Sequence, residues 1–189
     1  MKGITTGDWD GLERTARIFL GRFYYDETQL GRGALKGISR HSWEFIQTSA
    51  GASFTQLKNA VDLVDRVDYY HGITYATNES SSEYEGVTLG NYINMDIGGS
   101  IVGDFGNYVE KSDQMFAHEY GHTIQGRMFG PLYSLLSVLS FGSAVFDYYL
   151  PINHSHNHFF TEVMANRFAS KNFSNYLWPD VANKYPIAY

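Results

Sequence analysis

The chain has 189 residues, a length that suits one domain with a hydrophobic core. Its 43% hydrophobic and 18% charged residues are typical of a folded protein and exclude a disordered one. The net charge of −6 and the lack of any Lys/Arg-rich run argue against a nucleic-acid partner, and the absence of cysteine excludes disulfides and thiolate metal ligands.

The N-terminal part is expected to form an irregular, glycine-rich lead-in over residues 1–40, with one short helix near residues 11–20. Its first ten residues contain no apolar stretch of the kind found in a secretory signal. A single domain is expected over residues 41–189. It begins with a helical pattern over residues 43–64, followed by a strand, a turn at His71-Gly72 and a second strand within residues 67–77.

The middle of the chain is predicted to contain a polar loop and a further strand. Residues 78–83 are polar and predict the loop. Residues 87–97 predict one half-buried strand, because apolar side chains alternate there with period two: Val87, Leu89, Ile93, Met95 and Ile97. Gly98-Gly99 is expected to end this strand.

Residues 114–128 predict a helix that follows an N-cap at Ser112 or Asp113 and stops at Gly130-Pro131. Its apolar stripe, which turns toward the core, consists of Phe116, Tyr120 and Ile124. Residues 132–146 carry no charge but fall short of the about 20 residues that span a bilayer. A buried or lid-forming helix is favoured there over a membrane-inserting segment. A last helix is predicted over residues 160–172.

The motif with the clearest chemistry is His118-Glu119-Tyr120-Gly121-His122, which matches the H-E-x-x-H zinc signature. Two histidines four apart lie on one face of a helix, with Cβ atoms about 5–6 Å apart, so both rings can reach one metal ion. Glu119, next to the first ligand, can take a proton from a water bound to that metal. The motif therefore predicts a Zn²⁺ site with Glu119 as the general base.

A catalytic zinc site needs a third protein ligand and an open position. The extension H-E-x-x-H-x-x-G-x-x-H is excluded, because Gln125 and Met128 occupy the positions of its glycine and third histidine. The remaining candidates are a downstream carboxylate or one of three histidines: His154, His156 and His158. Glu162 is preferred because it lies in a helix-forming segment 40 residues beyond His122, which suits a helix returning against the first.

A glutamate followed four residues later by asparagine resembles the third-ligand helix of thermolysin-like glutamate zincins. The resemblance implies a small, twisted, mostly antiparallel sheet packed on the motif helix, together with a second, ligand-bearing helix. It also implies that Asn166 hydrogen-bonds the free ring nitrogen of a ligand histidine. The strand before the motif helix would be the edge strand, where Val87, Leu89 and Asn91 pair with an extended peptide, although an ordinary sheet strand remains an equal alternative.

Five segments also resemble bacterial zincin metallopeptidase domains found at the C-termini of Rhs/YD-repeat and other polymorphic-toxin-type proteins. They are residues 67–72, 88–94, 118–125, 130–133 and 160–167, within a region of about residues 60–175. This resemblance implies a secreted effector, one delivered to another cell, or a host-facing peptidase.

The residues and resemblances together predict an α+β, zincin-like endopeptidase that uses Zn²⁺ and acts on a peptide or protein. Stabilising the oxyanion of the reaction needs a hydrogen-bond donor. The candidates for that role are Tyr148, Tyr149, His154, His156 and His158. Two alternative functions remain: a catalytically silent, zinc-stabilised binding or adhesion module, and a membrane-acting domain that inserts residues 132–146.

Overall fold

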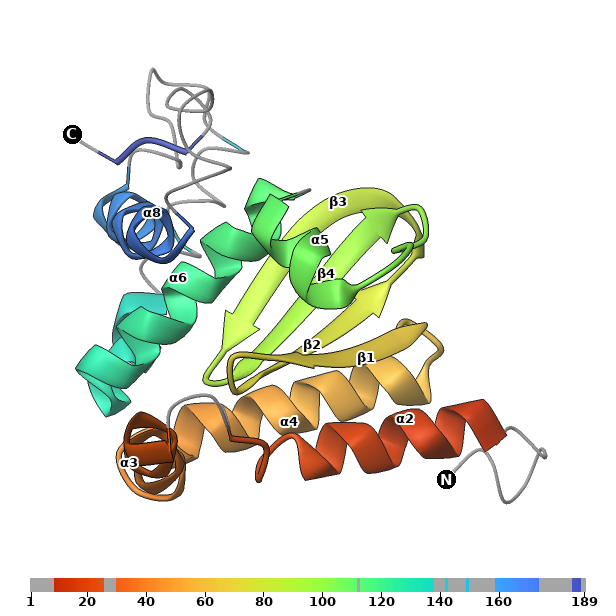
Figure 1. The fold of residues 1–189 in the computed structure, drawn as a ribbon, viewed down its shortest axis with the longest axis horizontal. Helices are drawn as coiled ribbons and strands as arrows, with labels where there is room; N and C mark the ends of the chain where they lie inside the picture. Colours follow the sequence, from red (N-terminus) through yellow and green to blue (C-terminus); the bar gives the residue numbers. More distant parts are fainter. Residues whose placement is uncertain are drawn as a thin grey trace.

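The computed structural model of the chain describes residues 9–25, 30–111, 113–137, 142, 149, 159–173 and 185–187. A four-stranded sheet lies between helices on its two faces (Figure 1), which is the α+β architecture expected. In chain order, the elements are α2 (Trp9–Leu20), α3 (Leu30–His41), α4 (Phe45–Ala60), β1 (Arg66–Tyr70), β2 (Ile73–Asn78), β3 (Ser80–Leu89), β4 (Tyr92–Gly98), α5 (Phe105–Lys111), α6 (Gln114–Phe129) and α8 (Phe160–Asn172).

The sheet is mixed, with the strand order β1-β2-β4-β3. The pairs β1/β2 and β3/β4 are antiparallel, whereas β2 and β4 run parallel. The expectation of a mostly antiparallel sheet is therefore confirmed. Because β3 pairs with β4 alone in this order, it forms an edge of the sheet, and α6 packs beside it.

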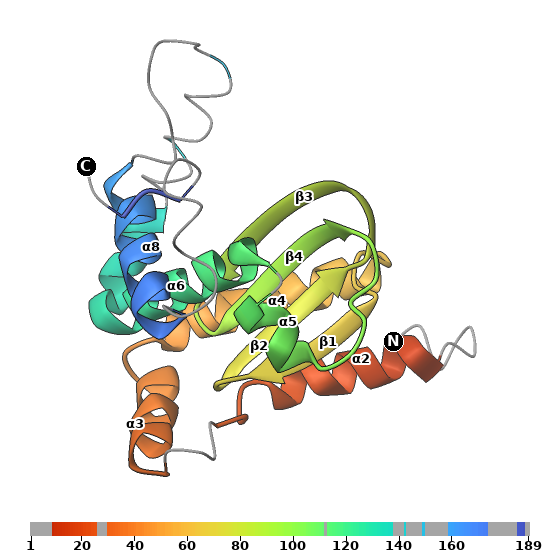
Figure 2. The ribbon, with the colours of Figure 1, turned by 45° about the horizontal axis from the view of Figure 1, so that its top comes forward.

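Alternation along the strands divides the interior into two cores, one on each side of the sheet. Tyr75, Ile93 and Met95 face α5 and α6, and the apolar stripe of α6 that was predicted from the sequence packs against them. Ala76 and Tyr92 face the other way, into a smaller cluster with α2 and α4. Figure 2 shows the resulting layers, with α2 and α4 on one side and α6 between the sheet and α8.

The expectation of an irregular lead-in is wrong for the described part of residues 1–40, which forms α2 and α3. The helix expected near residues 11–20 is confirmed as α2, but α3 was not predicted. Its glycines lower the helix propensity, and tertiary contacts outweigh that cost. The buried Arg40 near the end of α3 donates hydrogen bonds to the backbone oxygens of Tyr24 and Gly72 and so ties the helix to the sheet.

The strand predicted over residues 87–97 is two strands, β3 and β4, which form a hairpin. Gly90 begins the two-residue turn with a φ of 60°, the conformation that favours glycine at this position of a hairpin loop. Most of the predicted polar loop 78–83 belongs to β3, which begins at Ser80. The expectation that the five apolar side chains share one face is wrong, because the turn puts Val87 and Leu89, which pair with Asn94 and Tyr92, on the face opposite to Ile93 and Met95. The Gly-Asn pair is a turn signal that the sequence analysis missed.

Beyond α6, residues 131–137 form a short helical segment in which Tyr133 is buried, whereas Leu132 and Leu135 are exposed. Residues 132–146 were expected to form a buried or lid-forming helix. In the described part of this stretch, Tyr133 is the one large side chain that is buried. Within the described part of the chain, no helix has both the length and the apolar character needed to cross a membrane.

The helices α6 and α8 approach each other closely at Gly121, the fourth residue of the H-E-x-x-H motif. A Cβ atom added at Gly121 would lie 2.1 Å from the backbone oxygen of Ala165 in α8. Any side chain at this position would therefore push the two helices apart. Glycine inside a helix costs about 1 kcal/mol of stability relative to alanine. The close approach of α8 explains why a glycine nevertheless occupies position 121.

We predict that Gly121→Ala lowers the free energy of unfolding by about 1–3 kcal/mol, because the new methyl group overpacks the α6/α8 contact. Gly126→Ala is the matched control on the same helix, since its Cβ would meet side chains alone: the end of Gln47 at 3.3 Å and the ring of Tyr133 at 3.6 Å. This control should stay within about 1 kcal/mol of the wild type. Urea unfolding of both variants checks the prediction, and equal stability of the two would contradict it.

Candidate metal centre

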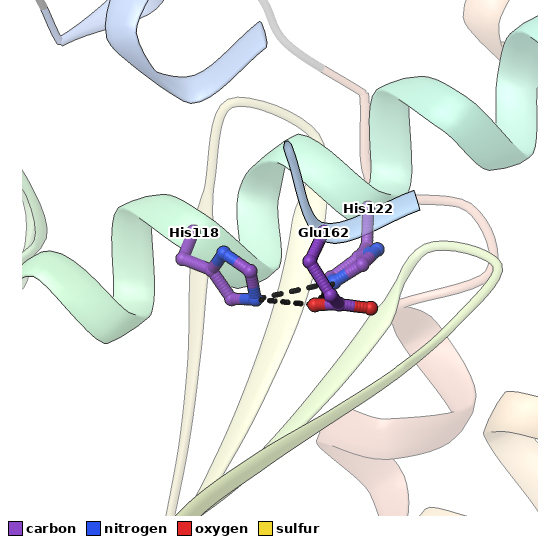
Figure 3. Close-up of side chains that lie close together, drawn as sticks. All are labelled: His118, His122 and Glu162. Atoms are coloured by element: carbon purple, nitrogen blue, oxygen red, sulfur yellow. Dashed lines mark hydrogen bonds and ion pairs between the residues drawn. The ribbon is translucent and has the colours of Figure 1, made fainter. Parts of the chain in front are cut away.

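Three buried side chains from α6 and α8 converge on one point. His118 and His122 lie on the same face of α6, and Glu162 lies in the first turn of α8. The two Nε2 atoms are 3.2 Å apart, and each is 3.2 Å from Oε2 of Glu162. Figure 3 shows the three side chains pointing toward one another. The structure thus brings together the three residues that the sequence proposed as metal ligands.

Local features of both helices place these side chains. Asp113 caps α6, because its side chain accepts a hydrogen bond from the backbone N–H of Met115 at 2.9 Å. The capped helix then carries its two histidines one turn apart on the side that faces α8. On α8, the Thr161 hydroxyl donates to Oε1 of Glu162 at 3.2 Å, which leaves Oε2 directed at the histidines.

Two buried amides fix the protonation of the histidine rings. Asn166 and Gln125 present their Oδ1 and Oε1 atoms to Nδ1 of His118 and of His122, both at 2.7 Å. Their NH₂ groups donate elsewhere, to the backbone oxygens of Pro186 and Thr161. Because an amide oxygen only accepts, each Nδ1 must carry the hydrogen and donate it. Each ring therefore has only its Nε2 left to bind a metal, and once that atom carries no proton its lone pair points toward Glu162.

Three electron-rich atoms in such a triangle repel one another unless a cation lies among them. An ion about 2.0–2.1 Å from each atom would form ligand–metal–ligand angles of about 100–106°, close to tetrahedral, and would keep a fourth position open. His118, His122 and Glu162 can therefore hold a metal ion. The amides are the partners that such sites use to orient their histidines, which is the role that the zincin resemblance implied for Asn166.

Glu119 lies on the side of α6 that faces β3. It is buried, with 5% of its surface exposed, and its Oε2 accepts a hydrogen bond of 2.6 Å from the Thr88 hydroxyl. Val87 and Leu89, which were proposed to bind substrate, alternate with Thr88 and point to the opposite face of the sheet. Asn91 lies in the hairpin turn, not in the strand, and donates to the backbone oxygen of Gly21.

The proposed oxyanion donors fall mostly in undescribed parts of the chain. Tyr149 is 72% exposed. The other four lie outside the described residues: Tyr148, His154, His156 and His158. The structure instead places Tyr185 beside the site, with its ring 5.3 Å from the ring of His118. Burial, together with the charges of Asp113 and Glu119, raises the pKa of Tyr185 to about 12, so its phenol stays protonated at neutral pH.

Several residues that support the site were missed by sequence reasoning. Gln125 was used only to exclude a third histidine, although its spacing of three from His122 placed it on the same helix face. Gly121 occupied a variable position of the motif. Thr88 and Tyr185 are distant in the chain, and no local pattern marks either as a neighbour of the site.

The chain matches no protein-family model, no curated protein and no solved structure. The residues and their geometry therefore carry the functional assignment.

We predict that metal binding releases a proton from His122 at neutral pH. Without a metal, burial lowers the pKa of His122, but the charge and hydrogen bond of Glu162 outweigh burial and raise the pKa to about 9. The histidines in turn hold the pKa of the Glu162 carboxyl well below its usual range, although burial alone would raise it. A metal must displace the His122 proton below pH 9, so affinity should rise about tenfold per pH unit between pH 7 and 9.

Isothermal titration of the chelator-treated protein with Zn²⁺, in buffers of different ionisation enthalpy, measures this release. About one proton per bound ion is expected at pH 7 and less above pH 9. The metal-free protein should also lose stability as the pH rises through 9, because a raised histidine pKa stabilises the fold only while the ring is protonated. Affinity that does not change between pH 7 and 9 would show that His122 is neutral.

We further predict that Asn166→Ala weakens metal binding about 10- to 100-fold, because His118 loses the acceptor that orients its ring. Asn172→Ala is the matched control on α8, since Asn172 is exposed and its amide donates to the backbone oxygen of Phe168 in the same helix. Competition with a chromophoric chelator measures both affinities. An unchanged affinity for folded Asn166→Ala would remove this residue from the site.

Proposed function

We propose that this protein is a zinc-dependent peptidase of the glutamate-zincin type, with His118, His122 and Glu162 as ligands and Glu119 as the general base. Two features together carry the proposal: the 3.2 Å triangle formed by two histidines of α6 and Glu162 of α8, and the buried Glu119 next to the first histidine. A metal site that only stabilised a fold would not need that glutamate.

Zinc is the metal that this set of donors favours. Two imidazole nitrogens and one carboxylate oxygen are the ligands of one common class of catalytic zinc site. The harder ions Mg²⁺ and Ca²⁺ prefer six or more oxygen ligands. Among the described residues this group supplies three donors, so a four-coordinate zinc held by them would have one position left for water, as a catalytic zinc requires and a closed structural site does not.

The chain's own groups supply the remaining functions of a hydrolase. Zinc in this position would lower the pKa of a bound water and polarise a substrate carbonyl. Glu119 is then the group that accepts the proton, and its burial beside β3 keeps it in one place. The β3 edge offers backbone N–H and C=O groups to an extended peptide, which would form one more strand.

The test is Glu119→Gln, which keeps the shape of the side chain and removes the base. We expect full zinc content and a loss of cleavage of about 10²- to 10⁴-fold, measured on a fluorogenic peptide that the wild type cleaves. Glu13→Gln on the distant α2 is the control and should cleave normally. His122→Ala should lose both zinc and cleavage.

Two outcomes would contradict the proposal. Wild-type rates in zinc-loaded Glu119→Gln would show that Glu119 is not the base. A wild-type protein with one zinc per chain that cleaves no member of a broad peptide library would favour a zinc-stabilised binding module instead.

A further inference from the structure

The contact between Glu119 and β3 has two parts, and the first is the hydroxyl of Thr88. It lies 2.6 Å from Oε2 of Glu119 and 3.1 Å from the backbone oxygen of the same residue. A hydroxyl has a single hydrogen to donate, and the shorter distance to a charged acceptor identifies the carboxylate as the main partner. One oxygen of the base is therefore held, and Oε1 remains for the proton that the base would accept.

The second part is the lack of a side chain at Gly86. A Cβ atom added there would lie 2.6 Å from Oε1 and 2.7 Å from Cδ of Glu119. Glycine weakens the interior of a strand, and Gly86 does not have a positive φ that would require it. The close approach of the Glu119 carboxylate thus explains why residue 86 has no side chain. Gly86 and Thr88 share the face of β3 that is turned to α6.

We propose that Thr88 and Gly86 are positioning residues for the general base: Thr88 holds one carboxylate oxygen of Glu119, and Gly86 leaves the space in which the carboxylate lies. This inference rests on the proposed function, because it concerns the residue that would accept the proton. It adds a second role to β3. The strand proposed to pair with the peptide backbone also sets the position of the base, so both reacting partners are aligned on one strand.

The hydrogen bond from Thr88 to Glu119 is not explained by the need of a buried hydroxyl for a partner. Thr77, on β2 of the same sheet, is 1% exposed, and its Oγ1 has no hydrogen-bond partner among the described residues. This sheet therefore tolerates a buried threonine without a carboxylate partner. Thr77 also provides a matched control, because a valine there also removes a buried hydroxyl, one that has no hydrogen bond to Glu119.

The experiment compares Thr88→Val, Thr88→Ser and Thr77→Val, all loaded with zinc, on a fluorogenic peptide that the wild type cleaves. For Thr88→Val we expect kcat to fall about 10- to 100-fold with KM within about twofold, because a misplaced catalytic group slows the chemical step. Thr88→Ser should retain most of kcat, since it keeps the hydroxyl. Thr77→Val should match the wild type.

A second pair of variants tests the space at Gly86. Gly86→Ala should lower kcat as Thr88→Val does, because its methyl group displaces the carboxylate. Gly98→Ala in β4 is the control, since its Cβ would meet only the Ser81 backbone oxygen at an ordinary 3.5 Å. In a Glu119→Gln background, Thr88→Val should cost no further activity, because two residues that act as a unit are not additive.

Crystal structures of the wild type and Thr88→Val give a readout that does not need activity. We expect one Glu119 conformer in the wild type and a displaced or divided side chain in the variant. An unmoved Glu119, or a Thr88→Val protein with wild-type kcat, overturns this inference and leaves the proposed function standing. A wild type that cleaves no peptide defeats the proposed function, and the two structures still decide whether Thr88 positions Glu119.

Discussion

The site depends on how closely α8 can approach α6. The backbone oxygen of Ala165 occupies the place where a side chain at position 121 would project, so glycine in the motif sets the separation of the two helices. Glu162 lies three residues before Ala165 and reaches the histidine pair only at that separation. Gly121 therefore links a packing constraint to coordination chemistry: the third ligand of the triangle is available because the fourth motif position has no side chain.

The charges of the buried side chains also constrain the contact between α6 and α8. A buried carboxylate next to two histidines is costly without a positive charge among them, whether that charge is a proton or a metal ion. The two groups that orient the rings, Asn166 and Gln125, are neutral amides, so they fix the ring tautomers without adding negative charge. One divalent ion would then be balanced by one carboxylate, and the cluster would keep a net positive charge suited to polarising a carbonyl.

The motif helix is held from two directions, and each neighbour supports a different part of the site. On one side, α8 supplies Glu162 (Figure 3). The same helix supplies the amide of Asn166. On the other side, β3 contacts Glu119 through Thr88 and Gly86. The proposed metal ligands and the proposed base thus have separate supports, so a substitution in β3 should disturb proton transfer without removing the metal. Such a division makes the two functions separable by experiment.

Local patterns in the sequence were enough to predict α6 with a cap at Ser112 or Asp113, α8 with both its ends, and the histidine pair. Caps and helical spacing act between residues a few positions apart. The hairpin at Gly90 was also a local signal, and it was overlooked because the alternation continued through it. Helix α3 and the contacts of Thr88 and Gly86 with Glu119 were decided only by the tertiary structure. They join residues 16 to 33 positions apart, and no local periodicity records which atoms will come within a few ångströms of one another.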